Sequence, residues 1–491
     1  NLVNLKDFDL SFCENLVEVP DLSMATNLKV VALTECKSLR QVHPSILSLP
    51  SLQALDLEGC TEIQSLQSDV HLESLQDLRL SKCSSLKEFS VSSVELKRLW
   101  LDGTHIQELP SSVWRSAKLS LINVQGCDNL DSFGDKFSYD PRTACVHGLV
   151  LSGCKQLSAS NLHFILDGLP SLTWLELEYC FNLRMLPDSI GLLSSLEELK
   201  LSGSNVESLP ASIKNLSKLR NLYLDNCMKL MSLPELPHSL RLLSAANCTS
   251  LVASFTQLNI PFDSVLVPGG HVPDWFSFHA EGASVTIPHL PHAGLCGFVF
   301  CVVLSRSPSN GKYGYVDCFI YKNSKRVDDR KITSVVEQNL SMDHVFLFFV
   351  DITKGGDNSI LKKLQKGGVD SALMRLLKGE AYDPPKISFE FLPEYEDGKW
   401  STKMIKGCGV YPIYASEQKG LELEFGGSSR DIVELEPDNS NDIDELQFKG
   451  SNHNSDDNQT KKLEEVVHQT ITTGLKHVKV DSNETSCHDF V

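Results

Sequence analysis

The chain has 491 residues, which at roughly 150 residues per domain allows two to four domains. Hydrophobic residues make up 41% of it and charged residues 22%, ordinary globular usage that excludes a wholly disordered protein. The net charge of −18 argues against nucleic acid or an anionic membrane as the main partner, because both bind basic surfaces. No run of about 18 apolar residues occurs, so the sequence predicts no membrane span.

A repeated pattern, L-x-x-L-x-L-x-x-C-x-x-L-x-x-L, dominates the first half of the chain. Its eleven copies begin at Leu5, Leu28, Leu52, Leu75, Leu96, Leu119, Val146, Leu172, Leu196, Leu219 and Leu240. The first and last of these positions are 235 residues apart over ten steps, a mean period of 23.5. This period lies in the range of about 20–29 that is typical of leucine-rich repeats.

The alternating part of each copy predicts a short parallel strand whose leucines point inward and whose intervening residues point outward. A single copy cannot bury its apolar face, so neighbouring copies must stack. The sequence therefore predicts an α/β leucine-rich-repeat solenoid of about eleven repeats over residues 1–255. Residues 131–144 form an insertion between two repeats, and Leu-Pro pairs such as Leu186-Pro187 end the segments opposite the strands.

Nine of the 15 cysteines occupy one repeat position: Cys13, Cys36, Cys60, Cys83, Cys127, Cys154, Cys180, Cys227 and Cys248. The repeat template allows Asn or Cys at this position, where the chain leaves the strand. We interpret these nine residues as a ladder of buried, reduced thiols, which fits a reducing compartment better than a disulfide framework. The alternative, metal binding or redox sensing, lacks support because no C-x-x-C pair occurs. The copies near Leu101 and Leu201 lack the cysteine.

The outward strand positions should form a concave sheet, the surface that solenoids commonly use for binding. Aromatic residues and arginine are the usual anchors of protein interfaces. We therefore predict that partner contacts involve the following residues: Trp100, Arg98, Trp174, Glu176, Tyr223 and Lys200. The alternative is that these aromatics are ordinary half-buried strand residues. The pattern names no ligand.

Residues 256–425 lack the repeat and contain short β-type runs between turn signals, which predict an antiparallel sandwich. The runs are 264–267, 284–287, 296–304, 315–322, 344–350, 386–392, 401–404 and 409–414. One helical interruption is expected over 360–377. Charge follows the same division: residues 1–255 carry 21 basic and 29 acidic residues, residues 256–425 carry 18 and 20, and residues 426–491 carry 6 and 14.

The last segment, 426–491, is predicted to be a solvated, disordered acidic tail. Leu463, Val466, Val467 and Ile471 share a helical face within it. We interpret this face as a transient helix, and a partner-binding helix is the alternative.

Motifs that carry chemistry are missing: there is no G-x-x-x-x-G-K-[ST], G-x-S-x-G, H-E-x-x-H or dinucleotide fingerprint. We therefore expect no catalytic, cofactor-binding or metal-binding residue in this chain. Four histidines lie near two cysteines in the second region: His271, His279, His289 and His292, close to Cys296 and Cys301. Their spacing fits no standard zinc pattern, and surface histidines flanking a strand are the favoured interpretation.

Several phrases carry a family resemblance. LSGCKQL, LPDSIGLLSSLEELKLSGSNVESLPASIKNLSKLRNLYLDNC and LPELPHSLRLLSAANCTSL are similar to the leucine-rich repeats of plant intracellular immune receptors that carry a TIR and a nucleotide-binding NB-ARC domain. VPGGHVPDWFSFHAEGASVTIPHLP, GFVFCVVL, DHVFLFFV, ISFEF and IKGCGVYPIY resemble the jelly-roll/Ig-like domain (C-JID) that follows the repeats in these receptors. The resemblance covers residues 1 to about 416.

The resemblance implies a recognition and autoregulatory module of a cytoplasmic or nucleo-cytoplasmic receptor. Its partners would be a pathogen effector or a host protein, and the NB-ARC domain of the same receptor. The nucleotide and NAD sites of the family lie in domains that this sequence does not show, so the resemblance implies neither a cofactor nor enzyme activity here. Because Asn1 lies inside a repeat, we expect the chain to be a C-terminal portion of a longer receptor or a truncated product.

Two alternatives differ in class from this interpretation. The first is an extracellular repeat receptor, although the N-x-L-x-G-x-I-P pattern usual there does not occur and the sequons at Asn215 and Asn339 are of a kind that arises often by chance. The second is an enzyme hidden in the jelly-roll domain, which a cluster of groups with shifted pKa values in a concave pocket would favour.

Overall fold

The computed structural model describes residues 2–68, 70–134, 145–251, 262–290, 294–307, 311–327, 332–353, 360–365, 386–395 and 401–415. Residues 1–426 form one compact unit, and residues 427–491 form a second. The predicted acidic tail, including its helical face, lies outside the described residues. So do most of the predicted insertion and residues 366–377 of the helix expected over 360–377.

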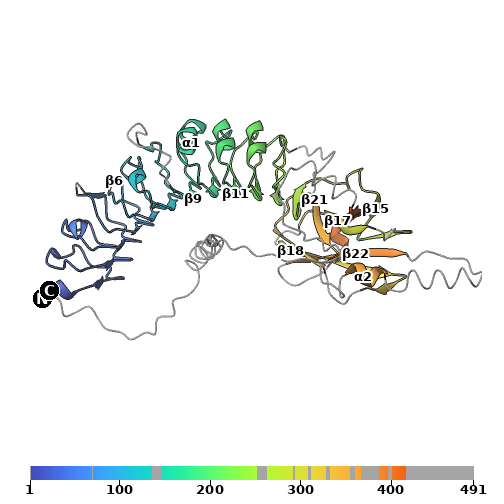
Figure 1. The fold of residues 1–491 in the computed structure, drawn as a ribbon, viewed down its shortest axis with the longest axis horizontal. Coiled ribbons are helices and arrows are strands. Elements are labelled where there is room, and N and C mark those ends of the chain that lie inside the picture. Colours follow the sequence, from blue (N-terminus) through green and yellow to red (C-terminus); the bar gives the residue numbers. More distant parts are fainter. Residues whose placement is uncertain are drawn as a thin grey trace, which may run out of the picture. The chain divides into compact units, whose positions relative to one another are not determined.

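Eleven strands of three residues each stand side by side in one parallel ladder, as Figure 1 shows for the repeats. They are β1 (Asp7–Asp9), β2 (Val30–Ala32), β3 (Ala54–Asp56), β5 (Asp77–Arg79), β7 (Arg98–Trp100), β8 (Leu121–Asn123), β9 (Gly148–Val150), β10 (Trp174–Glu176), β11 (Glu198–Lys200), β12 (Asn221–Tyr223) and β13 (Leu242–Ser244). Each strand belongs to one of the eleven predicted copies, so the leucine-rich-repeat solenoid is confirmed.

The alternation within each strand explains the ladder. The middle residue points into the stack and is buried, as at Leu55, Leu99 and Leu199, while its two neighbours face outward. Leucines flanking the strands fill the space between repeats and make one continuous apolar core. The repeats therefore stabilise one another through shared burial, as expected for a solenoid.

The side opposite the strands contains less α-helix than the predicted α/β class suggests. Within the described repeat residues it carries the 3-10 helices η1 (Leu2–Asn4), η2 (Ile46–Ser48), η3 (Val113–Arg115), η6 (Asp188–Leu192) and η7 (Ala211–Asn215), and one α-helix, α1 (Ala159–Leu166). Pro187 and Pro210 precede η6 and η7 directly. A second small parallel sheet pairs β4 (Ser65–Gln67) with β6 (Glu88–Ser90). Short convex segments of this kind fit a period of about 23 residues better than full α-helices do.

Each repeat leaves its strand through one residue in the left-handed region of backbone conformation. These residues are Phe12, Glu35, Gly59, Lys82, Gly103, Gly126, Gly153, Tyr179, Gly203, Asn226 and Asn247. Five of the eleven are glycine, the residue that adopts a positive φ without strain. The regularity shows that the same tight turn closes every strand of the ladder.

The region after the repeats contains two antiparallel β-sheets that pack face to face. Its elements are β14 (Ser264–Pro268), β15 (Phe278–Glu281), β16 (Ser284–Ile287), β17 (Leu295–Leu304), β18 (Tyr313–Lys322), β19 (Lys325–Arg326), β20 (Ile332–Gln338), β21 (His344–Asp351), α2 (Ile360–Gln365), β22 (Ile387–Tyr395), η9 (Thr402–Met404) and β23 (Ile405–Tyr414). Phenylalanines from both sheets, including Phe298, Phe300 and Phe389, form the core between them.

Most of the predicted β-runs of this region coincide with strands, with two kinds of exception. The prediction of a strand over 401–404 is wrong, because Thr402–Met404 is a 3-10 helix that leads into β23. The strands β15, β19 and β20 were not predicted, since their sequences are short or rich in charged and polar residues.

The two regions share one sheet. Strand β14 pairs in parallel with β13 of the last repeat and antiparallel with β21, so the ladder continues without a break into the sandwich. One face of the shared sheet, including Val265, Val299 and Leu347, extends the apolar core of the repeats, and the other face looks into the sandwich. The proposed divisions at residues 255 and 425 stay predictions.

Candidate protein-binding site

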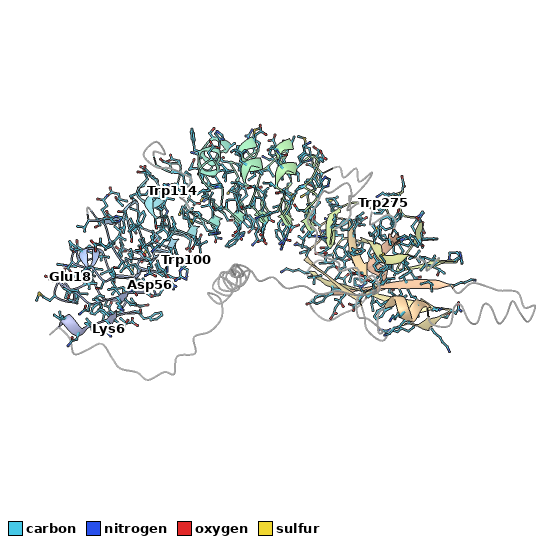
Figure 2. The ribbon with its side chains drawn as sticks, in the orientation of Figure 1. Lys6, Glu18, Asp56, Trp100, Trp114 and Trp275 are labelled. Atoms are coloured by element: carbon cyan, nitrogen blue, oxygen red, sulfur yellow. The ribbon has the colours of Figure 1, made fainter. Side chains whose placement is uncertain are left out.

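The outward face of the ladder is the candidate site. Three columns of residues run along it: the first and third residues of each strand, and the residue two positions after each strand ends. These columns contain ten carboxylates, namely Asp7, Asp9, Asp56, Glu58, Asp77, Asp102, Glu176, Glu178, Glu198 and Asp225. They contain three cations, namely Arg79, Arg98 and Lys200. Trp100 and Asp56 lie on this strand side, whereas Trp114 lies on the opposite side (Figure 2).

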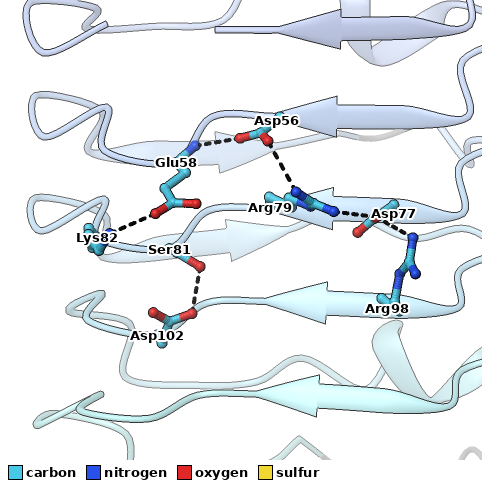
Figure 3. Close-up of polar contacts among 8 residues, drawn as sticks. All are labelled: Asp56, Glu58, Asp77, Arg79, Ser81, Lys82, Arg98 and Asp102. Atoms are coloured by element: carbon cyan, nitrogen blue, oxygen red, sulfur yellow. Dashed lines mark hydrogen bonds and ion pairs between the residues drawn. The ribbon is translucent and has the colours of Figure 1, made fainter. Parts of the chain in front are cut away.

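An ion-pair network occupies the face at β3, β5 and β7 (Figure 3). Asp77 is only 7% exposed and accepts from Arg98 at 2.6 Å and from Arg79 at 3.3 Å. Arg79 also lies 3.7 Å from Asp56, the pKa of which is raised by burial. Arg98, a predicted contact residue, is thus held by an internal carboxylate.

Two further polar contacts link neighbouring repeats beside this network. Glu58 pairs with Lys82 at 2.7 Å, and the hydroxyl of Ser81 donates to Asp102 at 2.5 Å (Figure 3). Burial raises the pKa of Asp102 despite that hydrogen bond. The solvent-exposed ion pair between Glu58 and Lys82 contributes roughly 0–1 kcal/mol, so it sets side-chain positions more than stability.

Trp100 lies on β7, two residues after Arg98. Its indole nitrogen is buried and has no hydrogen-bond partner among the described residues. Asn123 of the next repeat donates to Asp102 at 3.4 Å. Arg98 and Trp100 thus lie together as the two outward-facing residues of β7.

The other four predicted contact residues come together in a second cluster, at β10, β11 and β12. The ammonium of Lys200 lies 5.3 Å from the ring centre of Trp174 and 6.0 Å from that of Tyr223, within cation–π range. It also pairs with Glu176 at 2.6 Å and with Glu198 at 3.1 Å. Lys200 therefore binds two aromatic rings and two carboxylates in one fixed arrangement.

Gly148 on β9, the strand next to β10, leaves room for the ring of Trp174 in this cluster. A Cβ atom on Gly148 would come within 2.9 Å of Leu121 and 3.3 Å of the ring of Trp174. The side chains of these two residues consequently lie over the backbone of Gly148. We call the surface made by Leu121, Gly148, Trp174, Lys200 and Tyr223 the aromatic platform.

Burial and neighbouring charges shift the pKa values of three groups at or beside the aromatic platform. Burial lowers the pKa of Lys200, but its ion pairs with Glu176 and Glu198 outweigh burial and hold the pKa above its usual value. Burial, followed by repulsion from Glu176, raises the pKa of Glu178. Burial also raises the pKa of Asp225. Near the platform, Glu178 and Asp225 are thus carboxylates whose charged form is less stable than it would be in water.

Sequence reasoning missed two members of the platform, Leu121 and Gly148. Both occupy the first position of their strands, in register with Arg98 and Trp174. Counting positions in the repeat would have found them, but neither residue type marks an interface by itself. The indole nitrogen of Trp174, like that of Trp100, is buried without a partner among the described residues.

The cysteine column lies behind the face, inside the stack. From Cys36 onward each ladder cysteine donates its thiol to a main-chain carbonyl of the preceding repeat, as Cys60 does to Leu33 and Cys83 to Leu57, both at 3.1 Å. The two copies without cysteine place Thr104 and Ser204 in the same column. Burial raises the pKa of Cys60 to about 12. Burial likewise raises the pKa values of Cys36, Cys83, Cys127, Cys154 and Cys180, so these thiols are poor nucleophiles and act as hydrogen-bond donors.

The described residues contain no cluster of side chains suited to binding a metal ion. In the described ranges, no group of three or more His, Cys, Asp or Glu residues could hold a metal ion. His292 lies outside these ranges. Among the helices that are described, none is long and apolar enough to cross a membrane.

The fold and the site define the class: a leucine-rich-repeat protein whose strand ladder continues into a β-sandwich. Curated relatives place it among plant proteins. It is 35% identical over 500 residues to Protein SUPPRESSOR OF npr1-1, CONSTITUTIVE 1 of Arabidopsis thaliana, a match that covers 88% of this chain and 32% of the relative. It is 30% identical over 378 residues to Disease resistance protein RPS4B of Arabidopsis thaliana, covering 65% and 30%.

TMV resistance protein N of Nicotiana glutinosa is 31% identical over 294 residues, covering 49% of this chain and 25% of that protein. The chain's homologues are thus plant disease resistance proteins of the TIR-NB-ARC-LRR type, which confirms the resemblance. The chain spans about a quarter to a third of the length of these three relatives. No family model matches it.

Among solved structures, the leucine-rich repeat domain of the type III effector XopL is similar, with a TM-score of 0.30 and 22% identity over 49% of this chain and 75% of that chain. The plant peptide hormone receptor RGFR1 in complex with RGF2 gives a TM-score of 0.24 and 16% identity, over 49% and 55%. Scores this low say nothing about function.

Proposed function

We propose that this chain is the recognition module of a plant immune receptor and acts in the defence response by binding a partner protein. The aromatic platform carries the proposal. Aromatic anchors in fixed positions, with a polar rim, are the usual hot spots of protein interfaces. Trp174 and Tyr223 are already held in place by Lys200, so partner binding would freeze few side chains.

The plant disease resistance relatives suggest what the partner is: a pathogen effector or a host protein that an effector modifies. They also suggest an autoregulatory contact between this chain and a nucleotide-binding domain of the same receptor. We further propose a cytoplasmic or nucleo-cytoplasmic location, supported by the ladder cysteines from Cys36 onward, which keep their thiols and donate them to main-chain carbonyls. Binding, rather than catalysis, is the role proposed for the chain.

Co-immunoprecipitation with candidate effectors, expressed one at a time beside the full chain in leaf tissue, tests the proposal. We expect Trp174→Ala to reduce capture of the cognate effector by tenfold or more. Phe164→Ala is the matched control, because this aromatic residue is 61% exposed on α1, away from the strands. Thermal unfolding of both variants should match that of the wild-type chain.

A second variant probes the platform without removing an aromatic ring. Gly148→Ala would push a methyl group against Leu121 and Trp174, so the ring must shift by a few tenths of an ångström or more. We expect weaker capture, by roughly threefold or more, because interface anchors tolerate little displacement. Full binding by both Trp174→Ala and Gly148→Ala would refute a role for the platform.

A further inference from the structure

The acidity of the repeats is concentrated on one face. Residues 1–255 hold 21 basic and 29 acidic residues, a net charge of −8. The three columns of the outward strand face hold three of the basic and ten of the acidic residues, a net charge of −7. All other positions of the repeats together hold 18 basic and 19 acidic residues, so the rest of the solenoid is almost neutral.

The three cations on this face already form ion pairs with carboxylates of the same face. Arg79 and Arg98 share Asp77, and Lys200 bridges Glu176 and Glu198. Asp7, Asp9 and Glu178 form no ion pair with any described cation. The excess charge is therefore available to a partner and is not cancelled within the described part of the fold.

Four carboxylates of the face are destabilised in their charged form by their surroundings. The pKa values of Asp56, Asp102, Glu178 and Asp225 are all raised, with burial as the largest cause in each case. A cation placed beside them would relieve both the burial of charge and the repulsion between neighbours. An anionic or acidic partner would increase the repulsion.

We propose that the aromatic platform takes a basic face of the partner protein, one that presents arginine and lysine side chains toward Glu178 and Glu198. This inference rests on the proposed function and names the chemical class of its partner. Arginine suits the surface best, because its planar guanidinium both stacks on Tyr223 or Trp174 and pairs with a carboxylate. Charge complementarity of this kind steers association and selects between partners more than it adds affinity.

Selection of a displayed library of random 16-residue peptides on the full chain tests the inference. Peptides that also bind Trp174→Ala are removed in a parallel counter-selection, so that the remaining ligands depend on the platform. We expect these ligands to be enriched in arginine and lysine relative to the starting library. Their affinity should fall by roughly fivefold or more between 50 and 200 mM salt.

Paired charge variants give the matched control. Glu178→Gln combined with Glu198→Gln should weaken the selected peptides by about fivefold or more. Glu62→Gln combined with Glu73→Gln removes two exposed carboxylates outside the three columns and should leave binding unchanged.

Other outcomes separate the inference from the proposed function. Platform-dependent peptides that are neutral or acidic would overturn the basic partner while leaving the binding role of the platform intact. Platform-dependent basic peptides that are insensitive to the Glu178/Glu198 double variant would overturn the assignment of these carboxylates. A selection that yields no platform-dependent ligand would count against the proposed function itself, and the inference would fall with it.

Discussion

The main-chain N–H of Asn247 donates to Nε2 of His344 at 2.8 Å, although the two residues are 97 positions apart. Asn247 lies in the left-handed turn that follows the last repeat strand, β13 (Leu242–Ser244), and its side chain bonds Asn339 and Ser341 of the loop before β21. Nδ1 of His344 lies 2.8 Å from the carbonyl of Met342, which makes Nδ1 the protonated nitrogen and leaves Nε2 as an acceptor. A buried polar joint thus reinforces the shared sheet.

This joint predicts a pH dependence. Burial lowers the pKa of His344 below its ordinary value of 6.5, and this outweighs the opposing effects of the Met342 carbonyl and Asp343. The folded state therefore binds the proton less readily than the unfolded state does. Stability should be fully present above about pH 6.5 and should fall as the pH drops below that value. A protonated Nε2 would also meet the N–H of Asn247 and lose their hydrogen bond.

Thermal unfolding between pH 5 and pH 8 measures the effect, with His344→Gln as the test variant. A glutamine amide oxygen can accept from Asn247 but cannot titrate, so the slope of stability against pH should become shallower. His271→Gln removes an exposed imidazole and should leave the slope as it is. Equal slopes for the wild type and His344→Gln would disprove the assignment.

A charged residue in the stack should disrupt the solenoid. Leu57 is completely buried, and Leu57→Asp would place a carboxylate where the described structure offers it only apolar neighbours and main chain. The expected loss is several kcal/mol of unfolding free energy. Gln64→Asp, at an exposed position of the same repeat, should change stability by less than about 0.5 kcal/mol. Chemical denaturation of both variants makes the comparison, and normal stability of Leu57→Asp would contradict the phase of the repeat.

Individual residues of the repeats show which structural features could be predicted from the sequence and which could not. Leu57 and Cys60 were predictable, because a period repeated eleven times averages out the ambiguity of any single copy. Thr104 and Ser204 were predictable only as gaps in the cysteine column, since the structure was needed to show that their hydroxyls contact the thiol of the next ladder cysteine, 3.3 Å from Cys127 and 3.6 Å from Cys227. Their role depends on contacts across neighbouring repeats.

The junction and the platform were harder to predict. Nothing near Asn247 in the sequence points to His344, because their contact depends on how β14 inserts between β13 and β21. Trp174, Lys200 and Tyr223 could be chosen by residue type and strand position. Their clustering follows from parallel register, whereas the part played by Gly148 follows from the side chain it lacks.

The cysteine column can be tested at Cys60. Its thiol donates to the carbonyl of Leu33 at 3.1 Å, and that carbonyl also accepts from the main-chain N–H of Cys36. Cys60→Ala removes one donor and leaves a small void, so we expect a loss of about 1–2 kcal/mol in unfolding free energy. Cys60→Thr should cost less, because a hydroxyl restores a hydrogen-bond donor at this position. A larger loss for the threonine variant than for alanine would argue that packing, rather than the hydrogen bond, governs this column.

The left-handed turns offer a test of backbone conformation alone. Gly126 has a φ of +68°, and a Cβ atom built on it would meet nothing closer than 3.9 Å. Gly126→Ala should therefore cost about 1 kcal/mol from the dihedral angle itself, with no steric contribution.

Asn226 allows the reverse substitution at the equivalent turn position after β12, where its φ is +60°. Asn226→Gly relieves dihedral strain but loses the bond that the Asn226 side chain accepts from Asn247 at 3.1 Å. We expect these effects nearly to cancel, giving a change within about 0.5 kcal/mol. The denaturant midpoints of the two variants test both expectations. If Gly126→Ala unfolds at the wild-type midpoint, the turn tolerates an ordinary side chain, and the positive φ does not explain why glycine stands at this position.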